Sequence, residues 1–541
     1  MALWLVVVPI ALFQHSPLPW ASTRTLGIAW EMWNQNQFLV PLSNGRPDPS
    51  AMPLMFWLVH AGWAVAGVND VWPRLLQAAL GLCWLALSAA LARRGASTSG
   101  AVAQWVPWML VAMALPHLAV LQITEDLLTA VCAVGAFYAL SGRPAWCAFV
   151  LALSAGLLAT GPLMLGYVAV PLLLGPWWNA AAQEDSRRWY RRARLSVVCA
   201  LGLFLAWAGS AGAVGGAGYR LRLMTAEIAQ TVADTGPTLQ SPAFAAVLAA
   251  LLFPWMLWPR LWRAVLSARG TPGSAHRFAV AVVAPGLVMA VVAPGAQLRS
   301  VVAVLPVACI ALVHALAHQD AQGGGRRRAW GPWPIAVLLG AAGISLAWLV
   351  PLLASRPAPP AWLQDLASHG AGLGMIFAVF GVLLLALPRG TGAQMRTIAT
   401  VAFLSLAVCH GLFAWLFAPF LDVRPAAELL ARAARAGQPV AQVGRYREEL
   451  HFYARLQQPV AEIAETEVLE WARAHPTGLL VHRTPRGADA LGAGALYARP
   501  FGRHWMVVWP AASFLTPAPA TTAAHPVGAA AVSPAGASVG L

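Results

Sequence analysis

The chain has 541 residues, of which 59% are hydrophobic and only 10% are charged. Soluble domains carry roughly 25% charged residues, so this composition excludes a single water-soluble core. All 35 basic residues are Arg, and the formal net charge is +15. They occur in short clusters between apolar stretches, which is typical of the cytoplasmic loops of membrane proteins. We therefore expect membrane lipid as a partner and no nucleic acid.

Apolar stretches long enough to cross a hydrocarbon layer of ~30 Å recur along most of the chain. Their length and hydropathy predict about thirteen transmembrane helices. These lie near residues 1–20, 71–92, 101–121, 126–141, 145–159, 162–178, 195–217, 243–262, 277–293, 298–317, 330–354, 371–388 and 397–419. The first is interpreted as a transmembrane helix rather than a signal peptide, because it lacks a basic first region and a clean cleavage site.

The Arg clusters predict how these helices are oriented. With the N-terminus in the cytoplasm, the cytoplasmic side receives the clusters at 93–94, 187–194, 260–277, 326–328 and 389–396. This alternation requires that residues 53–67 do not cross the membrane, and we expect them to form a helix in its outer interface. The first loop, about 21–70, and the tail from Asp422 onward then lie on the outer side.

The composition changes at about residue 422, beyond which acidic residues become frequent. We predict a transmembrane domain over 1–421, a small α/β domain over 422–515 and a disordered tail over 516–541. The periodicity of the small domain predicts two helices and two strands, at 425–436, 462–475, 438–444 and 477–484 respectively. The predicted fold class is therefore an all-α polytopic membrane protein with a small C-terminal α/β domain.

The six cysteines all fall inside apolar stretches, and none lies in a CxxC pair or at metal-ligand spacing from a histidine. We interpret them as small buried hydrophobic residues. The sequence implies no cofactor and shows no metal-ligand set. Whether the protein binds a divalent cation is left open by the sequence. Charges are nearly absent from the middle of the predicted spans, which argues against an ion-coupled transporter. His117 and His410, the nearest candidates there, are interpreted as packed histidines.

Side chains that could take part in chemistry lie instead near the outer interface. Asp48 in the first loop and Asp126 in the next outer turn could act as a general base, a cation ligand or a helix cap. Arg24 and Arg46 carry a planar guanidinium that suits phosphate oxygens. Arg74 has the same chemistry, but its place at the start of a span favours an anchoring role.

The first loop carries short motifs in a fixed order. These are TRTLGIAWEM at 23–32, FLVP at 38–41, NGRP at 44–47, PLMFWL at 53–58 and GVND at 67–70. Their order and spacing resemble the first periplasmic loop of bacterial GT-C glycosyltransferases. The closest resemblance is to ArnT-type aminoarabinose transferases and their protein-mannosyltransferase relatives.

The resemblance continues along most of the chain. Thr124-Glu125-Asp126 is similar to the family's second outer loop, Thr160-Gly161-Pro162 to its Lys-Gly-Pro turn, and residues 452–460 to its C-terminal periplasmic domain. The resemblance implies transfer of a sugar from a polyprenyl-phosphate carrier to a lipid or cell-envelope glycan, at the periplasmic face of the bacterial inner membrane.

It also implies roles for the residues of the outer loops. A carboxylate, Asp126 or Asp48, would assist the acceptor. Arg24 and Arg46 would hold the carrier phosphate, where negative charge develops as it leaves.

Five positions lack the charged residue that the family carries there. The family's acidic pair falls on Ala21 and Ser22, its Glu-Lys on Ser50 and Ala51, and its Lys-Gly-Pro lysine on Thr160. These departures open a second hypothesis, an inactive paralogue that binds the lipid carrier or partners an active transferase. A third hypothesis, a lipid-linked-glycan transporter, predicts polar residues along a route through the membrane, and the sequence shows few.

Overall fold

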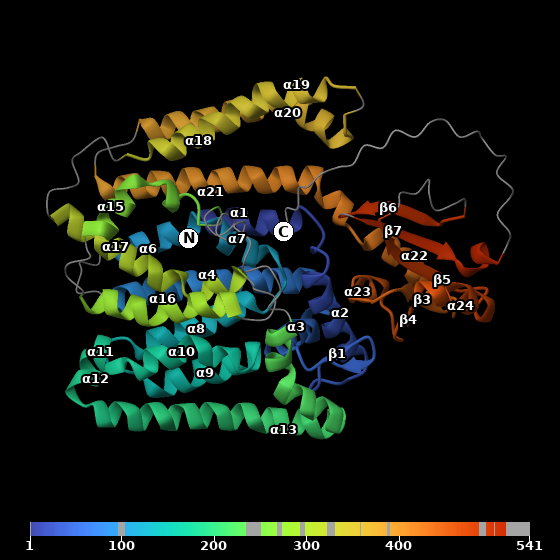
Figure 1. Cartoon of the computed structure of the whole chain (residues 1–541), viewed down its shortest axis with the longest axis horizontal. Coiled ribbons are helices and arrows are strands. Elements are labelled where there is room, and N and C mark those ends of the chain that lie inside the picture. Colours follow the sequence, from blue (N-terminus) through green and yellow to red (C-terminus); the bar gives the residue numbers. More distant parts are fainter. Residues whose placement is uncertain are drawn as a thin grey trace.

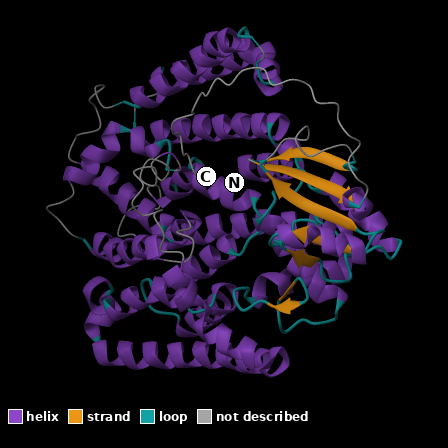
Figure 2. Ribbon diagram, turned by 45° about the vertical axis from the view of Figure 1, so that its right-hand side comes forward, coloured by secondary structure: helices purple, strands orange, loops and turns teal. Residues whose placement is uncertain are grey.

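The structure, a computed structural model, describes residues 2–95, 103–233, 250, 252–267, 273–292, 298–321, 331–357, 359–386, 390–485, 494–502 and 504–515. These residues form a large bundle of helices with a small domain at one end (Figure 1). Figure 2 shows that the longer strands all belong to this end of the molecule. The predicted disordered tail, 516–541, lies outside the described residues.

The helices of the bundle run along a common direction (Figure 1). Those in the first part are α1 (Ala2–Phe13), α4 (Val71–Gly95), α6 (Trp105–Val111), α7 (Ala114–Leu121), α8 (Asp126–Leu140), α9 (Trp146–Thr160), α10 (Leu163–Leu173), α11 (Gly175–Trp178) and α12 (Ala180–Glu184). Those in the second part are α13 (Ser186–Ala233), α15 (Pro259–Ser267), α16 (Ser274–Val292), α17 (Leu305–Ala321), α18 (Trp333–Ile344), α19 (Val350–Ala354), α20 (Ala361–Leu385) and α21 (Thr391–Leu416).

Among the described residues, five helices are long and apolar enough to cross a membrane. They are Val71–Arg94, Ser186–Leu223, Trp333–Ala354, Trp362–Leu385 and Thr391–Leu416. Shorter apolar helices of 10–17 residues occur between them in the sequence. The prediction of a mostly helical, multi-span membrane domain is confirmed. Helical segments occur in every predicted span, although the first part of 243–262 lies outside the described residues.

Two predicted spans have different limits in the structure. The helix expected over 101–121 is broken into α6 and α7, and Met113 between them has an extended backbone. Pro116 lacks the N–H that a continuous helix would use to bond the carbonyl of Ala112. The helix expected from residue 371 begins already at Ala361, directly after Pro360.

The first loop forms a compact layer between the bundle and the small domain (Figure 1). It contains α2 (Ala21–Asn34), a hairpin of β1 (Leu42–Ser43) and β2 (Arg46–Pro47), and α3 (Pro53–Ala66). Asn44 and Gly45 turn the hairpin with φ of 50° and 77°, the positive pair that an Asn-Gly turn favours. The helix predicted over 53–67 is confirmed as a helix, and its place in a membrane interface stays a prediction.

The small domain contains a five-stranded mixed sheet with the order β4-β3-β5-β7-β6. Its elements are α22 (Arg424–Arg435), β3 (Val440–Val443), α23 (His451–Ala454), β4 (Ala461–Ile463), α24 (Val468–Ala474), β5 (Leu479–Thr484), β6 (Tyr497–Phe501) and β7 (His504–Pro510). β3 is parallel to both of its neighbours, and β7 is antiparallel to β5 and β6. The apolar face of α22 packs with residues of β5 and β7 in one buried cluster.

One prediction for this domain is wrong in part. Residues 462–475 were expected to form a single amphipathic helix, but the segment begins in β4 and only Val468–Ala474 is α-helical. Glu462 and Ile463 pair in parallel with Gln442 and Val443 of β3, so the sheet overrides the local helical pattern.

Candidate functional site

The helix α2 presents Arg24, Gly27 and Glu31 on one face, because residues three and four apart lie above one another on a helix. This face packs against the start of α23 in the small domain. Gly27 allows the close approach, since a Cβ at this position would lie 2.8 Å from the Cβ of Glu448. The first loop and the small domain therefore meet along α2.

Arg24 and Asp48 form an ion pair in the first loop. The guanidinium also donates to the hydroxyl of Ser50, at 3.1 Å. The other carboxylate oxygen of Asp48 accepts from the backbone N–H and the hydroxyl of Ser50, at 2.9 and 2.7 Å. The Arg24 side chain is 41% exposed and Asp48 only 13%, so the arginine is the member of the pair that is open to a ligand.

Asp126 is the first residue of α8. Its carboxylate accepts a hydrogen bond from the hydroxyl of Thr124, at 2.7 Å. The loop before it is fixed to α2, because the backbone N–H of Ile123 donates to the hydroxyl of Ser22 at 3.0 Å. The side chain of Gln77 on α4 also donates to the carbonyl of Thr124, at 2.8 Å. The structure thus joins the second candidate carboxylate to the helix that carries Arg24.

The remaining positions named from the sequence differ in exposure. Arg46 is exposed at the tip of the hairpin, and within the described part of the chain its side chain makes no ion pair. Ala51 is buried, at 6% exposure. Thr160 is half-buried at the end of α9, before Gly161 with φ of 70°. Neither Ala51 nor Thr160 supplies a charge to the site.

A second polar cluster links the small domain to the bundle. Asp70 accepts hydrogen bonds from Arg74, at 2.6 Å, and from the hydroxyl of Tyr453 on α23, at 3.0 Å. Arg74 also donates to the carbonyls of Leu12 and His15. These contacts connect the first turn of α4 to the end of α1, and the role of Arg74 as an anchor of a membrane span stays a prediction.

Arg455 extends this interface beside α2. Its guanidinium lies over the rings of Trp30 and Phe452, with 4.9 and 4.2 Å to the ring centroids, and it donates to the carbonyl of Val68. The indole of Trp30 donates in turn to the carbonyl of Leu456, at 2.8 Å. The small domain is therefore fixed to the first loop by hydrogen bonds and aromatic contacts.

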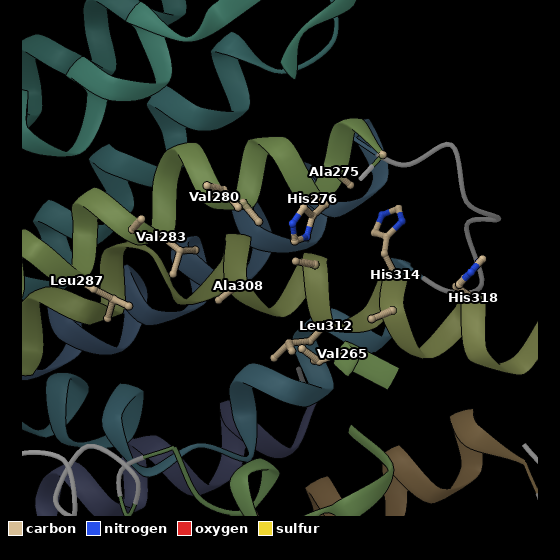
Figure 3. Close-up of a pocket in the computed structure, with 15 residues that line it drawn as sticks. Val265, Ala275, His276, Val280, Val283, Leu287, Ala308, Leu312, His314 and His318 are labelled. Atoms are coloured by element: carbon tan, nitrogen blue, oxygen red, sulfur yellow. The ribbon is translucent and has the colours of Figure 1, made fainter. Parts of the chain in front are cut away.

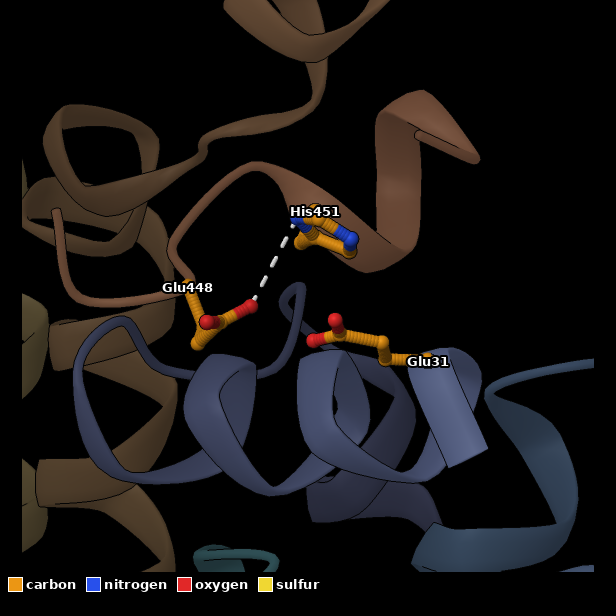
Figure 4. Close-up of side chains that lie close together, drawn as sticks. All are labelled: Glu31, Glu448 and His451. Atoms are coloured by element: carbon orange, nitrogen blue, oxygen red, sulfur yellow. Dashed lines mark ion pairs between the residues drawn. The ribbon is translucent and has the colours of Figure 1, made fainter. Parts of the chain in front are cut away.

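Three buried side chains converge where α2 meets α23, namely Glu31, Glu448 and His451 (Figure 4). Each is at most 3% exposed. The N–H of Gly45 donates to one oxygen of Glu31, and the hydroxyl of Ser43 donates to one oxygen of Glu448. Nδ1 of His451 lies 3.6 Å from the other oxygen of Glu448.

The burial of these groups disfavours their charged forms. It raises the pKa of Glu448 to about 8, and the nearby carboxylate of Glu31 adds to this shift. Burial also raises the pKa of Glu31 and lowers that of His451 to about 4. Glu448 has a φ of 63°, in the left-handed region that is strained for a residue with a Cβ. Such a combination is typical of a functional site.

Two apolar cavities lie within the bundle. One, of about 390 Å³, is bounded by α1, α7 and α21, and Gln122 beside the Asp126 loop lines it. His117 and His410 line it too, and each bonds a backbone carbonyl, which agrees with their interpretation as packed residues. The other cavity, of about 600 Å³, lies between α16 and α17. Figure 3 shows His276, His314 and His318 toward one end of it.

The sequence alone did not single out Glu448, His451 or Tyr219 as site residues. Tyr219 is buried on α13, and the charge of Asp48 is among those that act on its hydroxyl. The only signal in the sequence was the concentration of acidic residues after position 422. A local pattern cannot distinguish the buried Glu448 from its exposed neighbours in the tail.

Comparison with known proteins identifies the fold. No protein-family model matches the sequence, and no curated protein does. The crystal structure of ArnT from Cupriavidus metallidurans bound to undecaprenyl phosphate matches with a TM-score of 0.70 and 17% sequence identity, covering 95% of this chain and 98% of that one. Apo ArnT from the same organism matches with a TM-score of 0.69, at the same identity and coverage. The chain therefore has the ArnT-type GT-C fold that its motifs predict.

Proposed function

We propose that the protein is a membrane glycosyltransferase that transfers a sugar from a polyprenyl-phosphate carrier to a lipid or cell-envelope glycan. The observation that carries the proposal is the Arg24–Asp48 pair in the first loop of an ArnT-type fold. ArnT itself was crystallised with undecaprenyl phosphate. The reaction would take place at the end of the bundle that carries the first loop and the small domain.

The proposed reaction is a displacement at the anomeric carbon of the sugar. An acceptor hydroxyl gives its proton to a carboxylate of the site and forms a bond to that carbon. The bond between the carbon and the phosphate oxygen breaks, and its electron pair stays on the polyprenyl phosphate. A guanidinium beside this phosphate stabilises the charge as it develops.

The contacts favour different roles for the two candidate carboxylates. Asp48 is already held by Arg24 and Ser50, so we assign it the role of orienting Arg24 toward the phosphate. Asp126 lies at the first turn of α8, where its carboxylate accepts a hydrogen bond from Thr124, and we propose it as the base. Arg46, exposed on the hairpin, would add positive charge for the incoming phosphate.

The bundle contains a cavity that could hold the carrier, and its arginines indicate how the protein is oriented in the membrane. The apolar cavity of about 390 Å³ leads to Gln122, next to the Asp126 loop, and suits a polyprenyl chain. The C-terminal end of α4, whose last turn carries Arg93 and Arg94, lies away from the small domain (Figure 1). The positive-inside rule places that end in the cytoplasm, so the site would face the periplasm from the bacterial inner membrane.

The test combines genetics with purified protein. A strain that lacks the protein should lose one glycan or lipid modification by mass spectrometry, and purified protein should release polyprenyl phosphate from a polyprenyl-phosphate sugar when acceptor lipid is added. Asp126→Asn should reduce turnover by about 10²–10⁴-fold. Arg24→Gln should reduce it as well, while Arg435→Gln, a matched change on the exposed face of α22, should not. Full turnover by Asp126→Asn would exclude the assigned base.

A second candidate is an inactive protein that binds the carrier or partners an active transferase. The observation that favours it is that Ser22, Ala51 and Thr160 are uncharged, at positions where the family that the sequence resembles carries charged residues. This candidate predicts saturable binding of polyprenyl phosphate without turnover of the sugar-linked form. Turnover by the purified protein alone would exclude it.

A further inference from the structure

We infer that Glu31, Glu448 and His451 form a binding site for one divalent metal ion of the Zn²⁺ type, which fastens the first loop to the small domain. The inference does not depend on transfer activity. It concerns a cluster that lies beside Arg24 on α2 but that has no part in the proposed displacement.

The geometry fits a metal ion with ligands from three residues. One oxygen of each glutamate and one ring nitrogen of His451 all lie within 4.8 Å of one another. Zn²⁺ binds such atoms at about 2.0–2.2 Å in a tetrahedron, which places the ligand atoms about 3.4 Å apart. The 3.6 Å between Glu448 and His451 is already close to this separation, and the carboxylate of Glu31 points toward the same centre (Figure 4).

Each residue contributes one atom that has no other partner. Oε2 of Glu31, Oε2 of Glu448 and Nδ1 of His451 are buried and accept or donate no hydrogen bond among the described residues. The opposite oxygens of the two glutamates are held by Gly45 and Ser43. Buried polar atoms are nearly always paired, and outer hydrogen bonds that orient the ligands are typical of metal sites.

The charge of the cluster also calls for a cation. Two carboxylates are buried side by side, and within the described part of the chain no arginine donates to either one. The next residue shows the contrast, because the buried carboxylate of Glu449 is paired with Arg483 at 2.6 Å. A divalent ion would balance Glu31 and Glu448 in the way that Arg483 balances Glu449.

The choice of metal follows from the ligand types. Imidazole nitrogen with carboxylate oxygens suits Zn²⁺ and other first-row transition metals, whereas Mg²⁺ and Ca²⁺ prefer oxygen ligands alone. Three protein ligands leave a fourth position for water. Because Glu31 comes from the first loop and the other ligands come from the small domain, the bound ion would link two parts that lie far apart in the sequence.

The experiment measures Zn²⁺ itself on the full-length protein in detergent. The protein is stripped with a chelator, incubated with Zn²⁺, separated from free metal and analysed for metal content, and its thermal midpoint is recorded with and without Zn²⁺. We expect one equivalent of Zn²⁺ per chain and a higher midpoint with metal. Glu448→Gln and His451→Gln should each weaken binding at least about tenfold.

Glu449→Gln is the matched control, because it changes the neighbouring buried carboxylate outside the cluster and should keep Zn²⁺ binding. In the stripped protein, Glu448→Gln should not lower the midpoint, since it removes one of two adjacent carboxylates. If the two carboxylates only share a proton, the wild type will take up no Zn²⁺. That result, or equal Zn²⁺ binding by wild type and Glu448→Gln, would overturn the inference.

Discussion

Asp70 connects the small domain to the bundle, and its replacement by Asn tests how that interface is held. The carboxylate accepts from Arg74 at 2.6 Å and from Tyr453 at 3.0 Å. The Arg74 side chain is only 8% exposed and Asp70 is 27% exposed. We expect Asp70→Asn to lower the thermal midpoint of the whole chain, because it leaves a buried guanidinium without its counter-ion.

The structure allows a magnitude to be worked out. Removing one partner of a buried ion pair costs about 3–5 kcal/mol. Arg74 would keep the carbonyls of Leu12 and His15, and Asp70 is partly solvated, so about 2–3 kcal/mol is the expected loss of stability. Tyr453→Phe removes a single hydrogen bond and should cost about 1 kcal/mol.

The assay is thermal unfolding in detergent, followed by the fluorescence of the 26 tryptophans, for both single variants and the double variant. The double variant should lose less than the sum of the single losses, because both changes affect the same Tyr453–Asp70 hydrogen bond. A midpoint for Asp70→Asn that is no lower than that of Tyr453→Phe would refute the reasoning from the buried charge.

Three further variants test contacts elsewhere. Gly27→Ala places a Cβ 2.8 Å from that of Glu448, and overpacking should outweigh the gain in helix propensity, for a net loss of about 1 kcal/mol by thermal unfolding. Asn44→Ala removes two hydrogen bonds to the backbone of Val460, at 2.9 and 2.7 Å, and should cost about 2 kcal/mol in the same assay. Arg260→Met removes the buried side chain that joins α15 to α17 and α21, and should cost about 2 kcal/mol.

For each of these three variants, a different result would contradict the expected loss of stability. A more stable Gly27→Ala would mean that α2 and the small domain are not in close contact. An unchanged midpoint for Asn44→Ala would mean that the hairpin does not hold the segment around Val460. For Arg260→Met, a loss that disappears in high salt would point to a solvated pair, because buried pairs are screened much less.

The membrane domain could be predicted from the sequence because its signal is local. About twenty consecutive apolar residues suffice to define a span, and that length is visible in any window of the chain. Breaks within a predicted span are harder to locate from the sequence, since α6 and α7 separate at Met113, three residues before Pro116 rather than at the proline itself. The resemblance in the first loop added the ArnT-type fold, because the order of its motifs is also local information.

The candidate site could be predicted only in part, because its geometry joins segments that are far apart. Arg24 and Asp48 were named and do lie together. Glu31 and Glu448 could not be identified as partners from the sequence, since nothing in either segment shows that they meet at the contact between α2 and α23. The same limit explains β4, where pairing with β3 fixes the conformation of Glu462 against its helical pattern.

The structure also shows that Ala21 and Ser22, which stand where the family carries an acidic pair, lie in different surroundings. Ser22 is fully buried, and its hydroxyl accepts the N–H of Ile123 in the loop that leads to Asp126. Ala21 is half-buried at the first turn of α2. A carboxylate would therefore be accommodated at one position and not at the other.

Ser22→Glu and Ala21→Asp form a matched test of this difference. Ser22→Glu would bury an unpaired charge and displace the Ile123 loop, so it should cost at least about 2 kcal/mol in thermal unfolding. Ala21→Asp should be neutral or stabilising by about 0.3–1 kcal/mol, because an acid at a helix N-terminus interacts favourably with the helix dipole. Equal stability of the two variants would mean that Ser22 does not fix the Asp126 loop. A lower stability of Ser22→Glu than of Ala21→Asp would instead show that Ser22 holds the Asp126 loop in place. An acidic residue could then be introduced at position 21 but not at position 22.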